Sequence, residues 1–276
     1  MSSDMLRFPI IPLKAAGTVC SAILLLSCSV KEDRSDCPCF LTLDLGGVES
    51  AALMQRGLDS LVLSVVAGDA LSVREAVSLK DNVQEYSVAV PKSVVGLFVG
   101  SGTEPSWMGP GGMHIPEGRE CPVLYMHAES FTADAGEMRR TVSLHRNYCV
   151  LSVSMKTSYG ARPRPYRISL EGNVSGYLRD GTPEDGVFIC FSSPSSDGLC
   201  QLQIPRQRDD SLRLEIDFLD SGEVRTFPVG EYIAGSGYDW SAPDLEDIHV
   251  EMDFSRSSMT VSISKWKRTM SYEITF

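Results

Sequence analysis

The feature that most constrains this chain is a recurring alternation of apolar and polar residues over short segments. It is cleanest over residues 212–218, where four apolar residues alternate with Arg213, Glu215 and Asp217. A period of two puts successive side chains on opposite faces of a strand, so one face can be buried. Only Ser50–Leu58 offers a helical pattern, and there we expect one short helix or turn.

Similar short segments recur between Gly, Pro and Ser turns, roughly every 8 to 12 residues, which is typical of β-sandwiches and barrels. We therefore predict an all-β fold of two tandem β-sandwich domains, residues 37–146 and 147–276. A Gly- and Pro-rich loop at 100–118 carries Trp107. The predicted strands lie at residues 41–45, 61–66, 86–90, 94–99, 123–126, 140–144, 149–155, 166–170, 187–191, 199–204, 212–218, 248–254, 259–266 and 272–276.

The charge balance and the missing motifs exclude several functions. The chain has 276 residues and a formal charge of -11, the wrong sign for binding nucleic acid. It contains no nucleophile elbow, phosphate-binding loop, dinucleotide fingerprint or metal-binding pair of histidines. The paired acids Glu215 and Asp217 fit the solvent-facing side of a strand. We expect no catalytic residues, no metal and no cofactor.

The first 27 residues have the layout of a secretory signal. Arg7 and Lys14 precede an apolar run over residues 15–26, too short to span a bilayer comfortably. Leu25-Leu26-Ser27-Cys28 resembles the lipobox at which bacterial signal peptidase II cuts. This predicts acyl chains on Cys28 and attachment of the mature chain to a membrane. The alternative is a core cysteine that follows an apolar stretch.

Residues 28–36 are too polar to pack and predict a solvated tether. Within it, Lys31, Glu32 and Asp33 resemble the export code that sends some Gram-negative lipoproteins to the outer face of the outer membrane. An ordinary charged linker is the alternative. The expected location is the cell outer membrane, lipid-anchored and exposed at the surface.

Six cysteines remain once Cys20 and Cys28 are assigned to the signal and the lipid. In an oxidising compartment they suggest disulfides, and six cysteines allow fifteen connectivities. A hairpin centred on Ser195 would put Cys190 opposite Cys200, which makes this pair a candidate disulfide. Free thiols are the alternative. Cys37 and Cys39 are one residue apart, closer than paired zinc ligands normally are.

Two segments resemble one known family. Residues 31–44, with Cys37-Pro38-Cys39 at their centre, resemble the amino-terminal signature of the fimbrillin-associated anchor lipoproteins. Near the other end, the residues similar to the carboxy-terminal stretch of the same family are 229–233, 237–240, 247–250 and 263–266. The middle of the chain hardly matches.

The resemblance implies two transthyretin-like domains, a lipid on Cys28 and a non-enzymatic role at the base of a fimbria, whose length the protein limits. The implied partners are fimbrial shaft or accessory subunits. A sandwich with an exposed sheet edge can assemble with them by β-strand addition. The sequence leaves open whether the chain accepts a strand or donates its last one, Tyr272–Phe276.

The main rival interpretation is a surface lipoprotein that binds glycans. Exposed aromatic side chains would stack against sugar faces. The candidate platforms are Trp107, Tyr238, Trp240 and Trp266.

Overall fold

The computed structural model describes residues 37–156, 164–254, 258–263 and 268–274. The predicted signal and tether lie outside these ranges, and so does Trp266. Pro38–Phe276 forms one compact unit. Among the described residues, no helix has both the length and the apolar character needed to cross a membrane.

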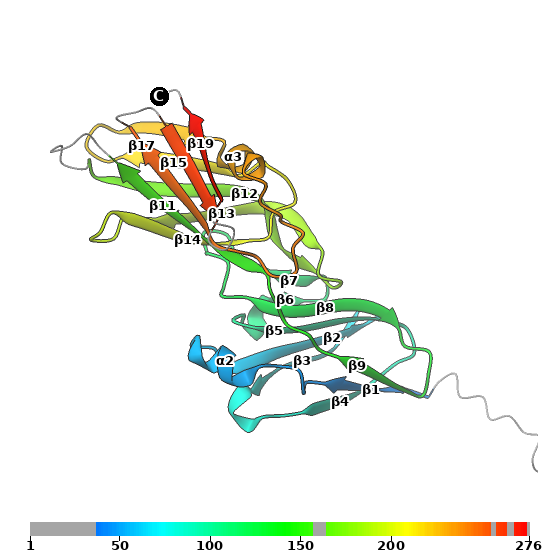
Figure 1. The fold of residues 1–276 in the computed structure, drawn as a ribbon. Coiled ribbons are helices and arrows are strands. Elements are labelled where there is room, and N and C mark those ends of the chain that lie inside the picture. Colours follow the sequence, from blue (N-terminus) through cyan, green and yellow to red (C-terminus); the bar gives the residue numbers. More distant parts are fainter. Residues whose placement is uncertain (1–36, 157–163, 255–257, 264–267, 275–276) are drawn as a thin grey trace, which may run out of the picture. The chain divides into compact units, whose positions relative to one another are not determined.

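The first half of the chain folds into two packed sheets (Figure 1). In the smaller sheet β1 (Cys39–Asp44) pairs antiparallel with β4 (Glu85–Val90) and parallel with β9 (Glu137–Thr141). The larger sheet consists of β3 (Ala70–Ser78), β2 (Ser60–Ala67), β5 (Val94–Ser101), β8 (Tyr125–Thr132) and β10 (His145–Arg146). The connections include the short helices α2 (Ser50–Gln55) and η1 (Leu79–Asp81). We call this half the first sandwich.

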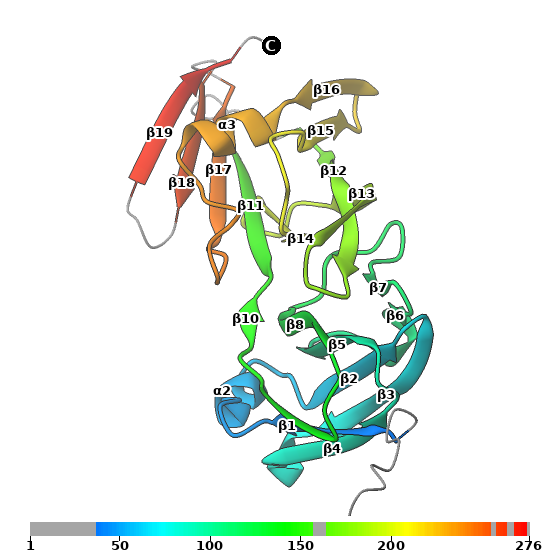
Figure 2. The ribbon, with the colours of Figure 1, turned by 90° about the vertical axis from the view of Figure 1, so that its right-hand side faces the viewer.

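The second half repeats this plan and is called the second sandwich. One sheet consists of β14 (Leu199–Pro205), β11 (Tyr148–Lys156), β17 (Ile248–Asp253), β18 (Ser258–Ile263) and β19 (Arg268–Glu273). The other contains β16 (Glu223–Phe227), β15 (Arg213–Phe218), β12 (Tyr166–Leu178) and β13 (Pro183–Ser192). Figure 2 shows the two layers, with helix α3 (Val229–Gly235) beside them.

The two sandwiches share one topology. The sheet orders β4-β1-β9 and β3-β2-β5-β8 correspond to β14-β11-β17 and β13-β12-β15-β16, in the same chain order. The parallel pair of the first and last strands, β1 with β9, recurs as β11 with β17. Besides the two-residue strand β10, two longer additions break the repeat. Residues 102–124, which we call the insertion, follow β5, and the β18–β19 hairpin follows β17.

The predicted all-β class is confirmed. The alternation over 212–218 forms β15, whose Leu214 and Ile216 are fully buried, and the predicted short helix is α2. The strand predicted at 140–144 is displaced and lies at 137–141. The sequence pattern does not predict β3, β10, β16 or α3. β3 is an outer strand with several polar, exposed residues, so it lacks a clean apolar face.

The predicted boundary after Arg146 falls between β10 and β11. The insertion crosses it, because β7 (Gly112–His114) pairs with β12 of the second sandwich and β6 (Met108–Gly109) pairs with β7. Whether residues 37–146 and 147–276 fold separately stays a prediction.

Candidate functional site

Four of the predicted site residues, Cys28, Lys31, Glu32 and Asp33, lie outside the described residues. The lipidation and the surface-export signal therefore stay predictions.

The hairpin predicted around Ser195 is wrong. Cys190 of β13 lies opposite Leu170 of β12, whereas Cys200 of β14 lies opposite Val153 of β11. Residues 193–198 thus carry the chain from one sheet to the other instead of folding it back on itself. Both cysteines are buried free thiols. A bridge between them stays a prediction without its original geometric basis.

Burial makes the thiols of four cysteines poor nucleophiles, because it disfavours their thiolate form. Burial raises the pKa of the Cys149 thiol to about 12, and burial also raises the pKa values of Cys121, Cys190 and Cys200. These thiols stay protonated at neutral pH. Within the described ranges, no three His, Cys, Asp or Glu residues are grouped so that they could hold a metal ion.

The two ends of the insertion lie close to each other. Gly102 has a φ of +92°, and a Cβ there would lie 2.0 Å from the carbonyl oxygen of Val123. The short helix η2 (Pro105–Trp107) follows, and the Trp107 N–H donates to the Glu104 carbonyl at 3.0 Å. This local hydrogen bond fixes the backbone of Trp107, from which the indole side chain extends.

The rest of the insertion is pinned to the second sandwich. Gly112 lies opposite Leu178, and Gly176 lies opposite His114. A Cβ on Gly112 would lie 2.0 Å from the Tyr177 carbonyl oxygen, so only glycine allows this contact. Side chains of the insertion also join the buried core of the second sandwich, among them Met108, Met113, Ile115 and Cys121.

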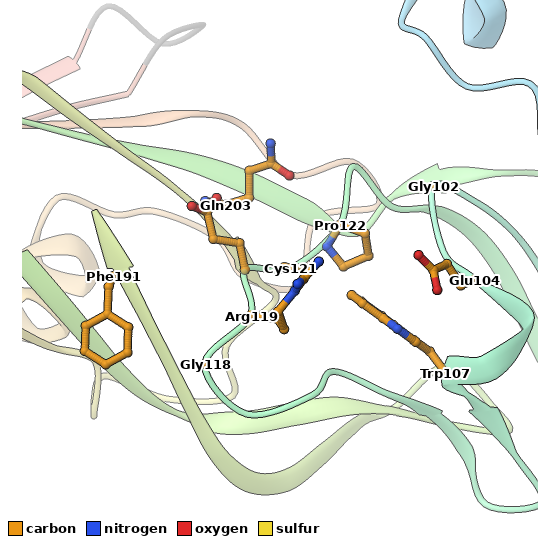
Figure 3. Close-up of a pocket in the computed structure, with 10 residues that line it drawn as sticks. Gly102, Glu104, Trp107, Gly118, Arg119, Cys121, Pro122, Phe191 and Gln203 are labelled. Atoms are coloured by element: carbon orange, nitrogen blue, oxygen red, sulfur yellow. Dashed lines mark hydrogen bonds between the residues drawn. The ribbon is translucent and has the colours of Figure 1, made fainter. Parts of the chain in front are cut away.

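The insertion and two strands of the second sandwich border an open hollow of about 560 Å³. Figure 3 shows Trp107 and Glu104 toward one end, Phe191 of β13 toward the other, and Arg119 between them. The lining residues are Gly102, Glu104, Trp107, Gly118, Arg119, Glu120, Cys121, Pro122, Phe191 and Gln203. The hollow thus combines two aromatic rings with charged and amide groups.

Hydrogen bonds hold the polar wall of the hollow in place. The Gln203 N–H donates to Glu120 Oε2 at 2.9 Å, and the Cys121 N–H donates to the Gln203 carbonyl at 3.0 Å. At the other end, the Ser106 hydroxyl donates to Glu104 Oε2 at 3.2 Å. Both carboxylates are therefore oriented by the protein itself.

Three of the four aromatic residues predicted as sugar platforms lie in the described ranges, and they occupy two different environments. Trp107 lines the hollow. Tyr238 and Trp240 pack against the core, with ring centroids 4.6 Å apart, and the Tyr238 hydroxyl donates to the Glu246 carbonyl at 2.6 Å. Phe191, which lines the far end of the hollow, was not predicted as a site residue, because it lies far from Trp107 in sequence.

The edge strands of the second sandwich are β13, β14, β16 and β19, and two of them, β19 and β13, are candidates for the addition of another strand. β19 pairs with β18 on one side, and no strand among the described residues pairs with its other side. β13 likewise pairs only with β12, and its Val187 and Phe191 side chains are 60% and 58% exposed. The predicted donor segment Tyr272–Phe276 begins inside β19, and its last two residues lie outside the described ranges.

No protein-family model and no curated protein matches the chain. Solved structures do. A candidate polysaccharide-binding protein from Bacteroides thetaiotaomicron matches with a TM-score of 0.57 at 12% identity, over 87% of this chain and 99% of its own. The fimbrial anchor protein Mfa2 from Porphyromonas gingivalis matches with a TM-score of 0.54 at 11% identity, over 85% of this chain and 100% of its own.

A candidate adhesin from Bacteroides ovatus matches with a TM-score of 0.54 at 10% identity, over 85% of this chain and 96% of its own. At these identities the likeness shows a shared fold. The shared fold therefore extends over both sandwiches.

Proposed function

We propose that this protein is a non-enzymatic outer-membrane lipoprotein that anchors a fimbria to the cell surface and limits its length. The observation that carries the proposal is the fold shared with the fimbrial anchor Mfa2 over the whole of that chain. The lipobox at residues 25–28 supports it, because an anchor needs attachment to a membrane.

The attachment rests on acyl chains at Cys28. Each buried methylene contributes about 0.8 kcal/mol, so two or more chains hold a folded domain on a bilayer almost irreversibly. The tether at residues 28–36 then spaces the sandwiches from the lipid, and Lys31, Glu32 and Asp33 direct the protein to the outer face.

The proposed assembly mode is β-strand addition to fimbrial subunits. An exposed edge supplies backbone hydrogen bonds, and side-chain pockets fix the register. The β19 edge suits an accepted strand. Donation of β19 would first break its six residue pairs with β18.

An engineered disulfide between β18 and β19 distinguishes donation of β19 from acceptance of a strand at its edge. Thr260 of β18 lies opposite Ser271 of β19, and their hydroxyl oxygens are 3.2 Å apart. A Thr260→Cys, Ser271→Cys variant would tie the two strands together. If β19 is donated, oxidation blocks assembly with fimbrial subunits and reduction restores it. If β19 accepts a strand, assembly is the same in both states.

The test of anchoring is deletion of the gene in the native host, followed by electron microscopy and analysis of the medium. We expect fimbriae of altered length and fimbriae released from the cells. A Cys28→Ala protein should move from the membrane to the soluble fraction. Wild-type fimbriae on the deletion strain, or a variant that stays in the membrane, would contradict the proposal.

A second candidate function is glycan binding at the cell surface, which the aromatic residues of the sequence also suggest. The hollow beside Trp107 favours it, because aromatic rings and polar groups meet there. A glycan-binding protein would leave fimbriae intact when deleted.

A further inference from the structure

We infer that the hollow between the insertion and strands β13 and β14 is a binding site for an uncharged saccharide, with Trp107 as its stacking platform. This inference deepens the second candidate function and is independent of the anchoring role. It names the site, the residues and the chemical class of the ligand.

The insertion is an addition to a repeated scaffold. In the second sandwich the equivalent connection, residues 219–222 between β15 and β16, is a tight turn closed by the Gly222 N–H donating to the Phe218 carbonyl at 2.8 Å. The first sandwich uses residues 102–124 at the same point. The topology does not require this length, and long ordered loops on rigid scaffolds commonly carry function.

Trp107 is held before any ligand arrives. It ends η2, and the next residue, Met108, is buried, with its carbonyl accepting a hydrogen bond from Arg74 Nη1 at 2.7 Å. The indole is partly buried and packs against the core of the second sandwich. A fixed aromatic face costs little conformational entropy on binding.

The chemistry of the lining suits a sugar ring. A pyranose has apolar C–H faces and a rim of hydroxyls that both donate and accept hydrogen bonds. Trp107 offers aromatic surface to one face, and Phe191 adds apolar surface at the far end of the hollow. Glu104, Arg119 and Gln203 offer an acceptor, a donor and an amide to the rim. A pocket with a few oriented polar groups among apolar surfaces is the usual form of a small-ligand site.

The charges select an uncharged ligand. Glu104 and Glu120 both line the hollow, against one cation, Arg119. The whole chain carries a formal charge of -11. A uronate or sulfated polysaccharide would therefore be repelled both locally and at long range.

The hollow is a poor place for an added β-strand. The N–H and carbonyl of Gln203 would be the groups that pair with a strand at this point of the β14 edge. Glu120 and Cys121 already occupy them. At this point the hollow therefore offers side chains to a ligand but no free backbone groups of Gln203 to a strand. We place strand addition at the β19 edge.

The experiment uses the purified mature protein with Cys28→Ala and measures binding to dextran, laminarin and mannan by affinity electrophoresis and calorimetry. Polygalacturonate and chondroitin sulfate are the charged comparison. We expect binding to at least one neutral glycan and none to the charged ones. Trp107→Ala should weaken binding at least tenfold and Phe191→Ala less. Phe40→Ala is the matched control, because Phe40 is 56% exposed on β1 and does not line the hollow.

Thermal melting checks that each variant is folded, and Trp107→Phe, which keeps an aromatic face, should retain part of the affinity. Neutral-glycan binding that survives Trp107→Ala would overturn this site and leave glycan binding as a function. If the protein binds none of the neutral glycans, or binds the charged ones more tightly, both the site and the second candidate function fail. Fimbrial anchoring is unaffected by either result.

Discussion

The two sandwiches share one seven-strand topology but differ in what has been added to it. The first carries the insertion after β5, and the second carries the β18–β19 hairpin after β17. The insertion builds the hollow and the junction with β12, whereas the hairpin gives the second sandwich its outermost edge. Both additions contribute buried side chains to the core of the second sandwich, among them Met113 and Val261, and they also form the hollow and the edge on which the two proposed functions depend.

The two sandwiches also differ in the strands at the edges of their sheets. In the first, Arg140 of β9 lies over the Phe131 ring of β8 at 4.1 Å, with its Nε 3.6 Å from a carboxylate oxygen of Glu129. Charged groups on an edge strand oppose the addition of another strand. In the second sandwich, β18 covers the equivalent edge of β17, and Tyr232 of α3 packs against Tyr272 of β19. The comparison favours the second sandwich as the place of strand addition.

The largest contrast should appear in thiol labelling. Cys37, at the start of the first sandwich, is exposed, whereas Cys149 of β11 is buried with a pKa of about 12. At pH 8 Cys149 is thiolate in only about one molecule in 10⁴, which slows alkylation. We expect iodoacetamide to label Cys37 in the native protein and Cys149 only after denaturation. Equal rates would contradict the buried position. Peptide mapping without reduction decides the predicted bridge between Cys190 and Cys200.

Core truncation tests whether the sandwiches unfold together. Leu43 and Leu214 are fully buried, one in each core. We expect Leu43→Ala and Leu214→Ala each to lower the free energy of unfolding by about 2–5 kcal/mol. Because the insertion is built into the second core, both should shift the same single transition in urea. Two transitions, each moved by only one variant, would show that the sandwiches are independent.

A smaller effect is expected at the junction itself. Gly112→Ala places a Cβ against the Tyr177 carbonyl at a φ of +142°, so we expect a loss of about 1–3 kcal/mol in stability. Gly111→Ala is the matched control, because a Cβ there meets no atom within 4 Å. If the two variants have the same urea midpoint, the β7–β12 contact is not formed as described.

The smallest effect concerns acid stability. Hydrogen bonding to Arg164 lowers the pKa of Asp220, and Arg225 and then Arg164 lower the pKa of Glu223. In the first sandwich, hydrogen bonding to Arg139 lowers the pKa of Asp44. A carboxylate whose pKa is lowered by folding stabilises the folded state at pH values above its ordinary pKa, which is 3.8 for Asp and 4.5 for Glu. This stabilisation is lost as the pH falls through the lower pKa of the folded state.

Thermal melting between pH 7 and pH 2 measures this dependence. We expect Arg164→Gln to flatten it more than Arg139→Gln, since Arg164 acts on two of these carboxylates. Arg213→Gln is the control, because Arg213 is exposed and has no ion pair among the described residues. An equal effect of all three variants would mean that these pairs do not contribute.

Much of the fold follows from local pattern. The alternation over 212–218 predicts β15 because a strand with one buried face needs that period. The crossing from β13 to β14 could not be predicted, because a Ser-, Pro- and Gly-rich turn serves a hairpin and a change of sheet equally well. α3 is too short to show a helical period. Trp107 stood out in its loop, but Phe191 and Gln203 reach the hollow only through tertiary pairing.

We propose that this protein is acylated on Cys28 and holds a fimbria through the β19 edge of its second sandwich. The most direct measurement is cross-linking mass spectrometry on the complex purified from the surface of the native host. We predict cross-links between a fimbrial subunit and the β18–β19 region, in material that carries acyl chains on Cys28. A complex without any fimbrial subunit, or with contacts confined to the first sandwich, would contradict the account.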